Sequence, residues 1–304
     1  MSTKYAGLPA GYVPRIHRAE VLGARRLGPG MIRVRFGGED LADYPTTGVG
    51  DEYVRVFFAE GSEAEPRMPR IAERGWDFPE GVEPAPMRTY TVRAHRPGEI
   101  DIDFVVHAGG VAAAWALQAS PGQVVAVNPP CPLYEAPPGI AKQILAADEP
   151  GLPAALRIAE LTAGRIATTV VAEIREPGNR LTAEVPAGVH IDYVWVEGTG
   201  NGRTPSQLLS VLRRLAPGED TYVWLASETR VIREVRKHLR HERKLPGEAY
   251  KCVGYWIERA EEWRARWEAL APEFRAHIEE LYESDRPVED VIDEVNALYE
   301  SVGL

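Results

Sequence analysis

The chain has 304 residues, of which 44% are hydrophobic and 26% are charged, and its formal net charge is -10. The length allows two domains of ordinary size, and the composition is that of a globular protein. The acidic excess argues against a general nucleic-acid binder, which needs clustered Lys and Arg. Because no apolar run is long enough, we expect neither a signal peptide nor a membrane-spanning segment.

The cysteine content indicates the compartment. Only Cys131 and Cys252 occur, and their spacing suggests neither a zinc site nor a disulfide framework. We therefore expect a cytoplasmic protein with no resident metal ion and with no nucleic-acid or membrane partner.

From His17 to about Pro130, short strands alternate with Gly and Pro, a pattern typical of a small antiparallel β-barrel. Residues 60–86 are rich in Gly, Pro and charge and predict an irregular excursion. The alanine-rich stretch Val111–Ala119 predicts one short helix. The expected strands are Ala19–Val21, Met31–Phe36, Tyr53–Phe58, Thr89–Ala94, Ile100–His107 and Val124–Val127.

After Pro137-Pro138-Gly139 strands alternate with helices, which predicts a parallel sheet covered by helices. The ligand crevice of such a sheet lies at the carboxyl ends of its strands, here near Asp148-Glu149 and Ser227-Glu228. The expected strands are Gln143–Ala147, Ala167–Ile174, Tyr193–Glu197 and Tyr222–Ala226, and the expected helices are Leu152–Leu161, Pro205–Leu215 and Thr229–Glu242.

The last segment, Glu261–Leu304, predicts two amphipathic helices, because apolar residues recur at helical spacing on both sides of Pro287. We expect this apolar stripe to pack against the parent domain. Docking on a partner protein is the alternative.

The stretch Arg88–Arg93 carries the most specific chemical signal. On a strand, side chains alternate with period two, so Arg88 and Tyr90 share one face and can hold a phosphate and a flat ring together. Thr91 could then bond a flavin edge, and Gly109-Gly110 lead into a helix whose free amides suit a pyrophosphate. A flavoprotein is indicated, and a barrel strand with solvated arginines is the alternative.

Read together, several motifs resemble those of the siderophore-interacting protein family, a branch of the ferredoxin-reductase-like flavoproteins. The resemblance covers about residues 15–257 and rests on the order and spacing of the motifs. They are Arg88–Arg93, Asp103–His107, Ala114-Trp115-Ala116 with Pro121-Gly122, Asp148-Glu149 with Leu152-Pro153-Ala154, the basic helix with Val235–Leu239, and Gly254-Tyr255-Trp256.

This resemblance implies a β + α/β protein. An antiparallel FAD-binding β-barrel (15–138) is followed by a parallel-sheet nicotinamide-binding-like domain (139–258) and a C-terminal helical extension (259–304). It further implies a reductase of ferric siderophores that releases their iron, with FAD as cofactor and NAD(P)H or ferredoxin as electron donor.

The resemblance also implies roles for individual residues. Arg88 would contact the flavin pyrophosphate, Tyr90 would pack on the isoalloxazine, and Thr91 would bond near its central nitrogen, with Val92 and Arg93 on the same cofactor-binding strand. The phosphate and adenine end would be lined by His107, Gly109, Gly110, Ala114 and Trp115.

In the second domain, Asp148 and Glu149 would meet a nicotinamide ribose or another reductant, and Tyr255 would reach back towards the flavin. Lys251 and Trp256 are the candidate catalytic residues, with Lys251 facing the siderophore.

Simpler structural roles compete with several of these assignments. Asp148 and Glu149 could cap the helix that follows them, because acidic residues favour helix N-termini. Trp115 could be a core residue, His107 a structural histidine and Lys251 a solvated surface lysine.

Local departures from the family pattern weaken single motifs. The chain has Val111-Ala112-Ala113 where the family tends to continue with Gly-Pro-Ala, and it lacks the glycine-rich dinucleotide fingerprint. Two functions compete with a ferric-siderophore reductase: a general NAD(P)H-flavin oxidoreductase, and a flavin-free protein that only binds a siderophore.

Overall fold

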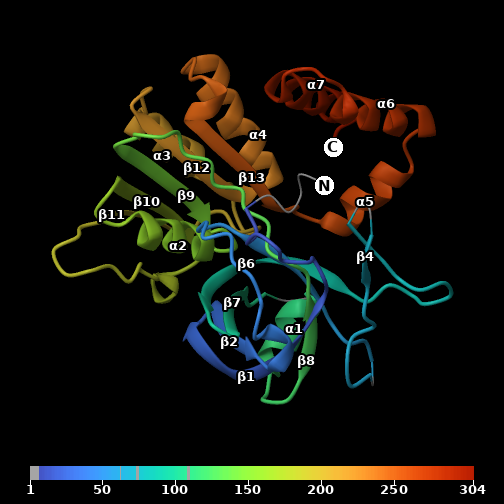
Figure 1. Ribbon diagram of the computed structural model, residues 1–304. Helices are drawn as coiled ribbons and strands as arrows, with labels where there is room; N and C mark the ends of the chain where they lie inside the picture. Colours follow the sequence, from blue (N-terminus) through green and yellow to red (C-terminus); the bar gives the residue numbers. More distant parts are fainter. Residues whose placement is uncertain (1–6, 62, 73–74, 108–109) are drawn as a thin grey trace.

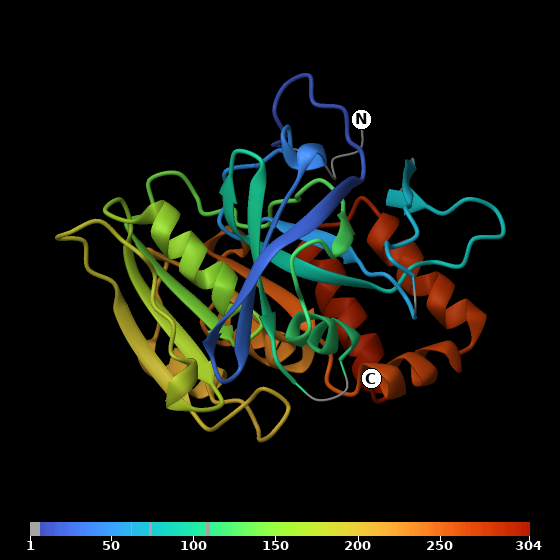
Figure 2. The same ribbon diagram turned by 90° about the horizontal axis from the view of Figure 1, so that it is seen from below.

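The structure is a computed structural model that describes residues 7–61, 63–72, 75–107 and 110–304. A β-barrel packs against a domain built on a parallel sheet, and a helical extension follows the last strand of that sheet (Figure 1). Seen from below, the barrel lies in front, with the sheet to one side in the view and the helices of the extension to the other (Figure 2).

The predicted barrel is confirmed. Six strands close in the order β1-β2-β7-β6-β3-β8, and every neighbouring pair is antiparallel. Fully buried apolar side chains such as Val34, Val54 and Phe104 fill the interior, so the barrel is a packed core. The strands are β1 (His17–Gly28), β2 (Met31–Gly37), β3 (Tyr53–Phe57), β6 (Met87–Arg96), β7 (Glu99–Val105) and β8 (Val124–Val127), and helix α1 is Val111–Leu117.

The excursion between β3 and β6 is more regular than the sequence suggested. It contains β4 (Arg70–Ala72) and β5 (Gly75–Asp77), which pair antiparallel as a two-stranded ribbon. The ring of Trp76 meets that of Phe57 edge-on at 5.5 Å, and this contact anchors the ribbon to the barrel. The expectation of an irregular segment was wrong here, because Gly and Pro flank strands too short to give a periodic signal.

The second domain is the predicted parallel sheet with helices on both faces. Its strand order is β11-β10-β9-β12-β13, and all neighbours run parallel. Helix α2 packs on the face that holds Trp224, and α3 and α4 pack on the other face. The strands are β9 (Lys142–Asp148), β10 (Ala167–Ile174), β11 (Asp192–Glu197), β12 (Thr221–Glu228) and β13 (Tyr250–Trp256), and the helices are α2 (Leu152–Thr162), α3 (Leu208–Leu215) and α4 (Thr229–Lys237).

Short helical turns complete the two domains. They are the 3-10 turns Glu39–Leu41, Pro177–Asn179 and Gly247–Ala249, and a π-helical turn, His238–Glu242, that continues α4. The barrel ends at Val127 and the sheet begins at Lys142, so the predicted domain boundary at residue 138 lies in the connection between them. The division into three domains stays a prediction.

The C-terminal extension contains three helices where two were expected: α5 (Ala260–Glu268), α6 (Pro272–Glu283) and α7 (Val288–Ser301). Pro272 accounts for the extra break, because proline lacks an N–H and fits only the first turn of a helix. Apolar residues of α6 and α7, among them Ile278 and Val295, form a small core of their own.

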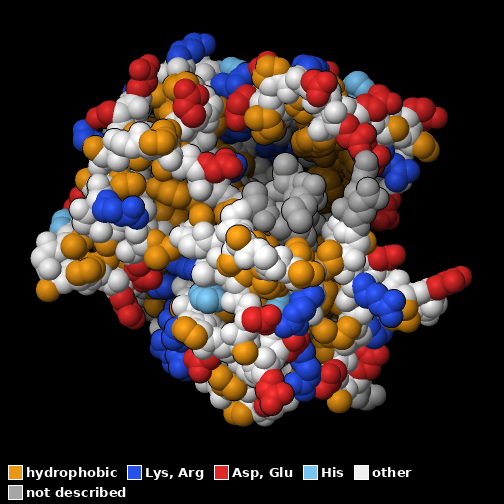
Figure 3. Space-filling model, viewed as in Figure 1, with side chains coloured by type: hydrophobic (Ala, Val, Ile, Leu, Met, Phe, Trp, Pro, Cys, Tyr) orange, Lys and Arg blue, Asp and Glu red, His pale blue; other side chains and the backbone are white. Residues whose placement is uncertain are grey.

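Ion pairs join the C-terminal extension to α4. Arg236 of α4, which is buried, forms ion pairs with Glu289 and Asp293 of α7. Figure 3 shows a hollow between these helices and the barrel, on the face seen in Figure 1. None of the described helices is both long and apolar enough to cross a bilayer.

Candidate functional site

The two faces of β6 have different surroundings. Tyr90 packs against the barrel core that contains Val92, and Arg88 shares this face by strand alternation. Thr91 and Arg93 project to the opposite face and meet the sheet domain. Strand alternation therefore places Arg88 and Tyr90 on one face of β6 and Thr91 and Arg93 on the other.

Arg88 offers an exposed cation at the end of the barrel. Its side chain is exposed, and Nη1 donates a 2.8 Å hydrogen bond to the carbonyl of Met87. Within the described residues, no carboxylate forms an ion pair with its guanidinium. An arginine in this state can bind phosphate oxygens without first losing a protein partner.

Tyr90 belongs to an aromatic group at the same end of the barrel. Its ring lies 4.4 Å from that of Phe104, which in turn lies 5.6 Å from Trp115. Burial raises the pKa of the Tyr90 hydroxyl well above its usual value, so the group stays protonated. Trp115 stacks on Phe36 and packs against the core, in agreement with the simpler core assignment, and its predicted adenine contact stays a prediction.

The turn into α1 passes close to the ring of His107. A Cβ on Gly110 would lie 2.7 Å from Nε2 of His107, so any larger residue here must displace this ring. Gly110 precedes the first residue of α1, where no side chain caps the helix. The amide of Ala114 donates to Gly110, and the predicted ligand Gly109 lies outside the described residues.

These features fit the FAD that the sequence predicts. An exposed guanidinium, a protonated tyrosine beside other aromatic rings, and a cradle that a Cβ would fill are the groups that a diphosphate and a flat heterocycle need.

Thr91 lies at the junction of the two domains. Its Oγ1 is 3.3 Å from the hydroxyl of Tyr255, the next-to-last residue of β13. The ring of Tyr255 meets Trp224 edge-on, and Trp224 donates a 2.8 Å hydrogen bond to Asp51 of the barrel. Tyr255 thus reaches back to β6, and burial raises the pKa of its hydroxyl. The contacts predicted between Thr91, Tyr255 and a flavin stay predictions.

Val92 and Arg93 form hydrogen bonds within the protein. The Val92 amide donates to the carbonyl of Glu52, and its own carbonyl accepts from Arg157. Arg93 forms two hydrogen bonds, of 2.7 and 2.5 Å, to the carboxylate of Glu160 in α2. Both residues hold the domains together here, and a role in cofactor binding stays a prediction.

Asp148 ends β9 as a buried carboxylate surrounded by donors. It accepts hydrogen bonds from Trp256 Nε1 at 2.7 Å, Ser227 Oγ at 2.8 Å, and the amides of Glu228 and Gly151. Burial raises the pKa of Asp148 to about 7, although these hydrogen bonds act in the opposite direction. Asp148 therefore fixes the Trp256 indole at the carboxyl edge of the sheet.

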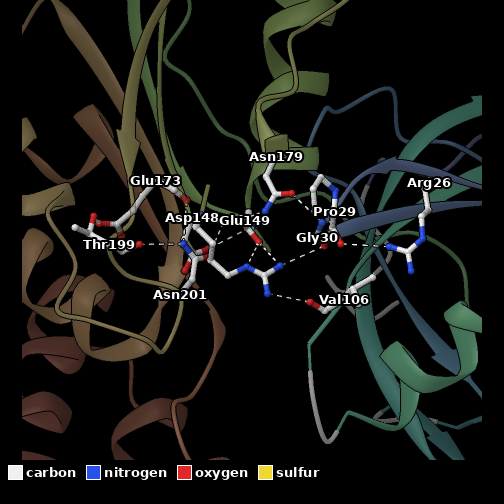
Figure 4. A network of polar contacts seen from close by, with 12 residues as sticks. Arg26, Pro29, Gly30, Val106, Asp148, Glu149, Glu173, Asn179, Thr199 and Asn201 are labelled. Atoms are coloured by element: carbon white, nitrogen blue, oxygen red, sulfur yellow. Dashed lines mark hydrogen bonds and ion pairs between the residues drawn. The ribbon is translucent and has the colours of Figure 1, made fainter. Parts of the chain in front are cut away.

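Glu149, the next residue, is fully engaged inside the protein. Its carboxylate accepts from Arg175 at 2.6 Å and from Asn179 at 2.7 Å, and its amide donates to Asn201 (Figure 4). Asp148 Oδ1 accepts a 3.4 Å hydrogen bond from the amide of Gly151, the residue that precedes α2, whereas the Glu149 carboxylate binds Arg175 and Asn179 instead of the helix start. Contact with a nicotinamide ribose stays a prediction for both.

Lys251 lies on β13, on the edge of the sheet. Its ammonium forms a 2.8 Å ion pair with Glu135, and its side chain is 32% exposed. The alternative of a surface lysine fits this setting, while a role towards the siderophore stays a prediction.

Sequence reasoning missed three polar residues near the same edge of the sheet: Arg175, Asn179 and Asn201. Each follows the carboxyl end of a strand, the position where ligand-binding residues gather in open α/β sheets. Their position after a strand was the one feature of the sequence that could have indicated these residues, because their partners are distant in the sequence.

Comparison with known proteins gives the family. The sequence profile of the siderophore-interacting FAD-binding domain matches residues 20–132, and that of the siderophore-interacting protein matches residues 140–259. The chain belongs to the siderophore-interacting protein family. The predicted family, the FAD-binding barrel and the FAD cofactor are thereby confirmed.

Similar proteins support the assignment. The NADPH-dependent ferric-chelate reductase of Escherichia coli is 29% identical over 247 residues, which are 80% of this chain and 93% of that protein. The ferric vibriobactin reductase of Vibrio cholerae is 29% identical over 74% of this chain and 83% of its own length. A siderophore utilization protein from T. fusca, known by crystal structure, superposes with a TM-score of 0.69 at 26% identity, over 82% of this chain and 95% of the other.

Proposed function

We propose that this siderophore-interacting protein is an FAD-dependent ferric-siderophore reductase, the function that the sequence predicted. The observation that carries the proposal is the arrangement of β6: the exposed Arg88 and the aromatic Tyr90 share one face, while Thr91 meets Tyr255 of the second domain. Relatives named ferric-chelate reductase and ferric vibriobactin reductase support the reaction class.

Different residues bind different parts of FAD. Arg88 holds the diphosphate by charge-assisted hydrogen bonds, and Gly110 lets the backbone approach it closely. Tyr90 and Phe104 offer an apolar aromatic surface to the ring system. Thr91 and Tyr255, which meet on the opposite face of β6, place two hydroxyl groups where the second domain joins the barrel. When bound, FAD supplies the chemistry that links a two-electron donor to a one-electron acceptor.

The substrate is Fe(III) in an oxygen-rich chelate. Such oxygen ligands hold the hard Fe(III) ion more tightly than Fe(II), so reduction itself promotes release. No side chain needs to act as a nucleophile. We assign Lys251 to attraction of an anionic chelate, after exchange of its contact with Glu135, and Trp256 to the apolar wall at the edge of the sheet.

The electron donor is NADPH in this proposal, as the name of the Escherichia coli relative states for that protein. It would bind at the carboxyl edge of the sheet, where Asp148 fixes Trp256. Ferredoxin is the alternative donor. The cytoplasm is the proposed compartment, because it supplies both donors in reduced form.

The test is anaerobic. Protein loaded with FAD is mixed with NADPH, NADH or reduced ferredoxin, and flavin bleaching is followed. Ferric siderophore and a ferrous-specific dye are then added. We expect bleaching with NADPH and dye colour only when the ferric chelate is present.

The competing functions give different results. Bleaching that reoxidises with free flavins or quinones, and gives no ferrous iron from any ferric chelate, would indicate a general flavin oxidoreductase. A protein that binds the ferric siderophore but no flavin would be a carrier, and the proposal would then be wrong.

A further inference from the structure

A buried polar cluster joins the sheet domain to the barrel next to the predicted flavin site. Arg175 follows β10, and its side chain is 11% exposed. Its Nε donates to Glu149 at 2.6 Å, and Nη1 donates to the carbonyl of Val106 at 3.0 Å. Nη2 lies 2.5 Å from the Glu149 carboxylate and 3.4 Å from the carbonyl of Gly30. One guanidinium therefore contacts the sheet and two separate loops of the barrel.

The barrel turn at Gly30 is fitted closely to this cluster. The Gly30 amide donates to Asn179 Oδ1 at 2.8 Å, and Asn179 Nδ2 donates to Glu149 at 2.7 Å (Figure 4). A Cβ on Gly30 would lie 2.6 Å from Asn179 Nδ2 and closer still to Arg175. A larger residue at position 30 would have to displace one or both of these side chains.

The position of Val106 links the cluster to the proposed diphosphate site. Val106 directly precedes His107, the residue whose ring confines Gly110 at the start of α1. The carbonyl that Arg175 holds thus belongs to the segment that leads into the proposed diphosphate site.

On the other side, the cluster continues along the carboxyl edge of the sheet. Glu149 donates its amide to Asn201 Oδ1 at 3.0 Å, and Asn201 Nδ2 donates to the carbonyl of Glu173 at 3.1 Å (Figure 4). This edge is where the proposed function binds its electron donor. Arg175 and Glu149 lie between the two sites.

We propose that Arg175, held by Glu149, is a positioning residue that fixes Val106 and Gly30 of the barrel, next to the proposed diphosphate site, against the carboxyl edge of the sheet. The inference rests on the proposed function and gives Glu149 a role other than contact with a nicotinamide ribose. A buried ion pair alone is weak evidence for stability, because the cost of desolvation offsets the attraction. Its hydrogen bonds to Val106 and Gly30 give it a positional role.

The test compares Arg175→Lys and Arg175→Gln with Arg180→Gln in the full chain. A lysine keeps the charge beside Glu149 but cannot reach Glu149, Val106 and Gly30 at once. Arg180 is the matched control, since its side chain is exposed and its ion pair with Glu197 joins two residues of the sheet domain. FAD affinity is measured by fluorescence titration of the apoprotein, and thermal unfolding of the apoprotein is measured in parallel.

We expect both Arg175 variants to bind FAD roughly tenfold more weakly or worse, as when charge-assisted hydrogen bonds are lost, while the control binds normally. At saturating FAD, we expect slower bleaching by NADPH and an altered visible circular dichroism of the flavin. A purely structural role would lower the unfolding temperature but leave FAD affinity and the flavin spectrum of the folded protein unchanged, and would overturn the inference.

The outcomes keep the two proposals apart. If wild type binds FAD and reduces ferric siderophore while the lysine variant matches it in affinity and spectrum, the positioning role is wrong and the proposed function stands. If wild type binds no FAD, the proposed function fails. Should Arg175→Gln not fold, Arg175→Lys and Asn179→Ala decide by the same measurements.

Discussion

The buried carboxyl of Asp148 makes the stability of this protein depend on pH in an unusual direction. Asp148 is almost completely buried at the carboxyl end of β9. Burial raises the pKa of its carboxyl from 3.8 to about 7, despite hydrogen bonds from Trp256 and Ser227. The folded protein therefore holds this proton more tightly than the unfolded chain does.

The sign of the effect follows from that difference. A raised pKa in the folded state stabilises the fold fully below the unfolded value of 3.8, and this contribution is lost as the pH rises through about 7. Each pKa unit corresponds to about 1.4 kcal/mol, so between about pH 5 and about pH 8 the loss is on the order of 3 kcal/mol. Most carboxylates make a folded protein more stable as the pH rises. The contribution of Asp148 must therefore be isolated by comparing the wild type with a variant that cannot titrate at this position.

The assay is urea unfolding, followed by tryptophan fluorescence, of wild type and Asp148→Asn at both pH values. The asparagine can still accept the Trp256 hydrogen bond but does not titrate. Wild type should lose about 3 kcal/mol more than Asp148→Asn between the two conditions. If the two proteins lose the same free energy within about 0.5 kcal/mol, ionisation of Asp148 is not penalised by burial and the reasoning is wrong.

Three further substitutions test other parts of the structure. Arg88→Ala should weaken FAD binding roughly 10- to 100-fold in a fluorescence titration, because charge-assisted hydrogen bonds to the diphosphate are lost. Arg157→Met should lower the free energy of unfolding by about 3–5 kcal/mol in urea, since it leaves the Glu52 carboxylate buried without its 2.7 Å partner. Arg236→Ala should release α7 and make residues 260–304 sensitive to limited proteolysis, because the ion pair to Glu289 is lost.

Each of these substitutions has a control. Arg25, exposed on β1, should tolerate alanine without change in FAD affinity, and equal losses in both variants would refute the assignment of Arg88. Pairing Arg157→Met with Glu52→Gln should restore part of the stability, and a double variant as unstable as the sum of both changes would refute the ion-pair argument. Arg286→Ala, which removes an exposed pair with Glu294, should leave proteolysis of the extension unchanged.

Local patterns predicted much of this fold because the features concerned are local. Period-two alternation placed Arg88 and Tyr90 on one face of β6, and strand–helix alternation predicted the parallel sheet. The edge strand β13 was missed because its residues are mostly half-buried, so no clear apolar alternation marks it.

Contacts between segments distant in the sequence could not be predicted in this way. Glu149 follows a strand and reads as a ligand contact, but its partners Arg175 and Asn179 lie 26 and 30 residues away. The same limit applies to Arg93, whose partner Glu160 is 67 residues away on α2. Sequence patterns report which face a residue occupies, whereas its partner depends on how distant segments of the chain pack together.

The most direct test of the central claim is the rate of ferrous iron release as a function of FAD occupancy. Apoprotein is titrated with FAD under anaerobic conditions with excess NADPH and a ferric siderophore, and Fe(II) is trapped by a specific dye. The account predicts no release without FAD and a rate that rises in proportion to bound FAD until one equivalent is reached. Iron release that is independent of FAD, or absent from the fully loaded protein, would contradict it.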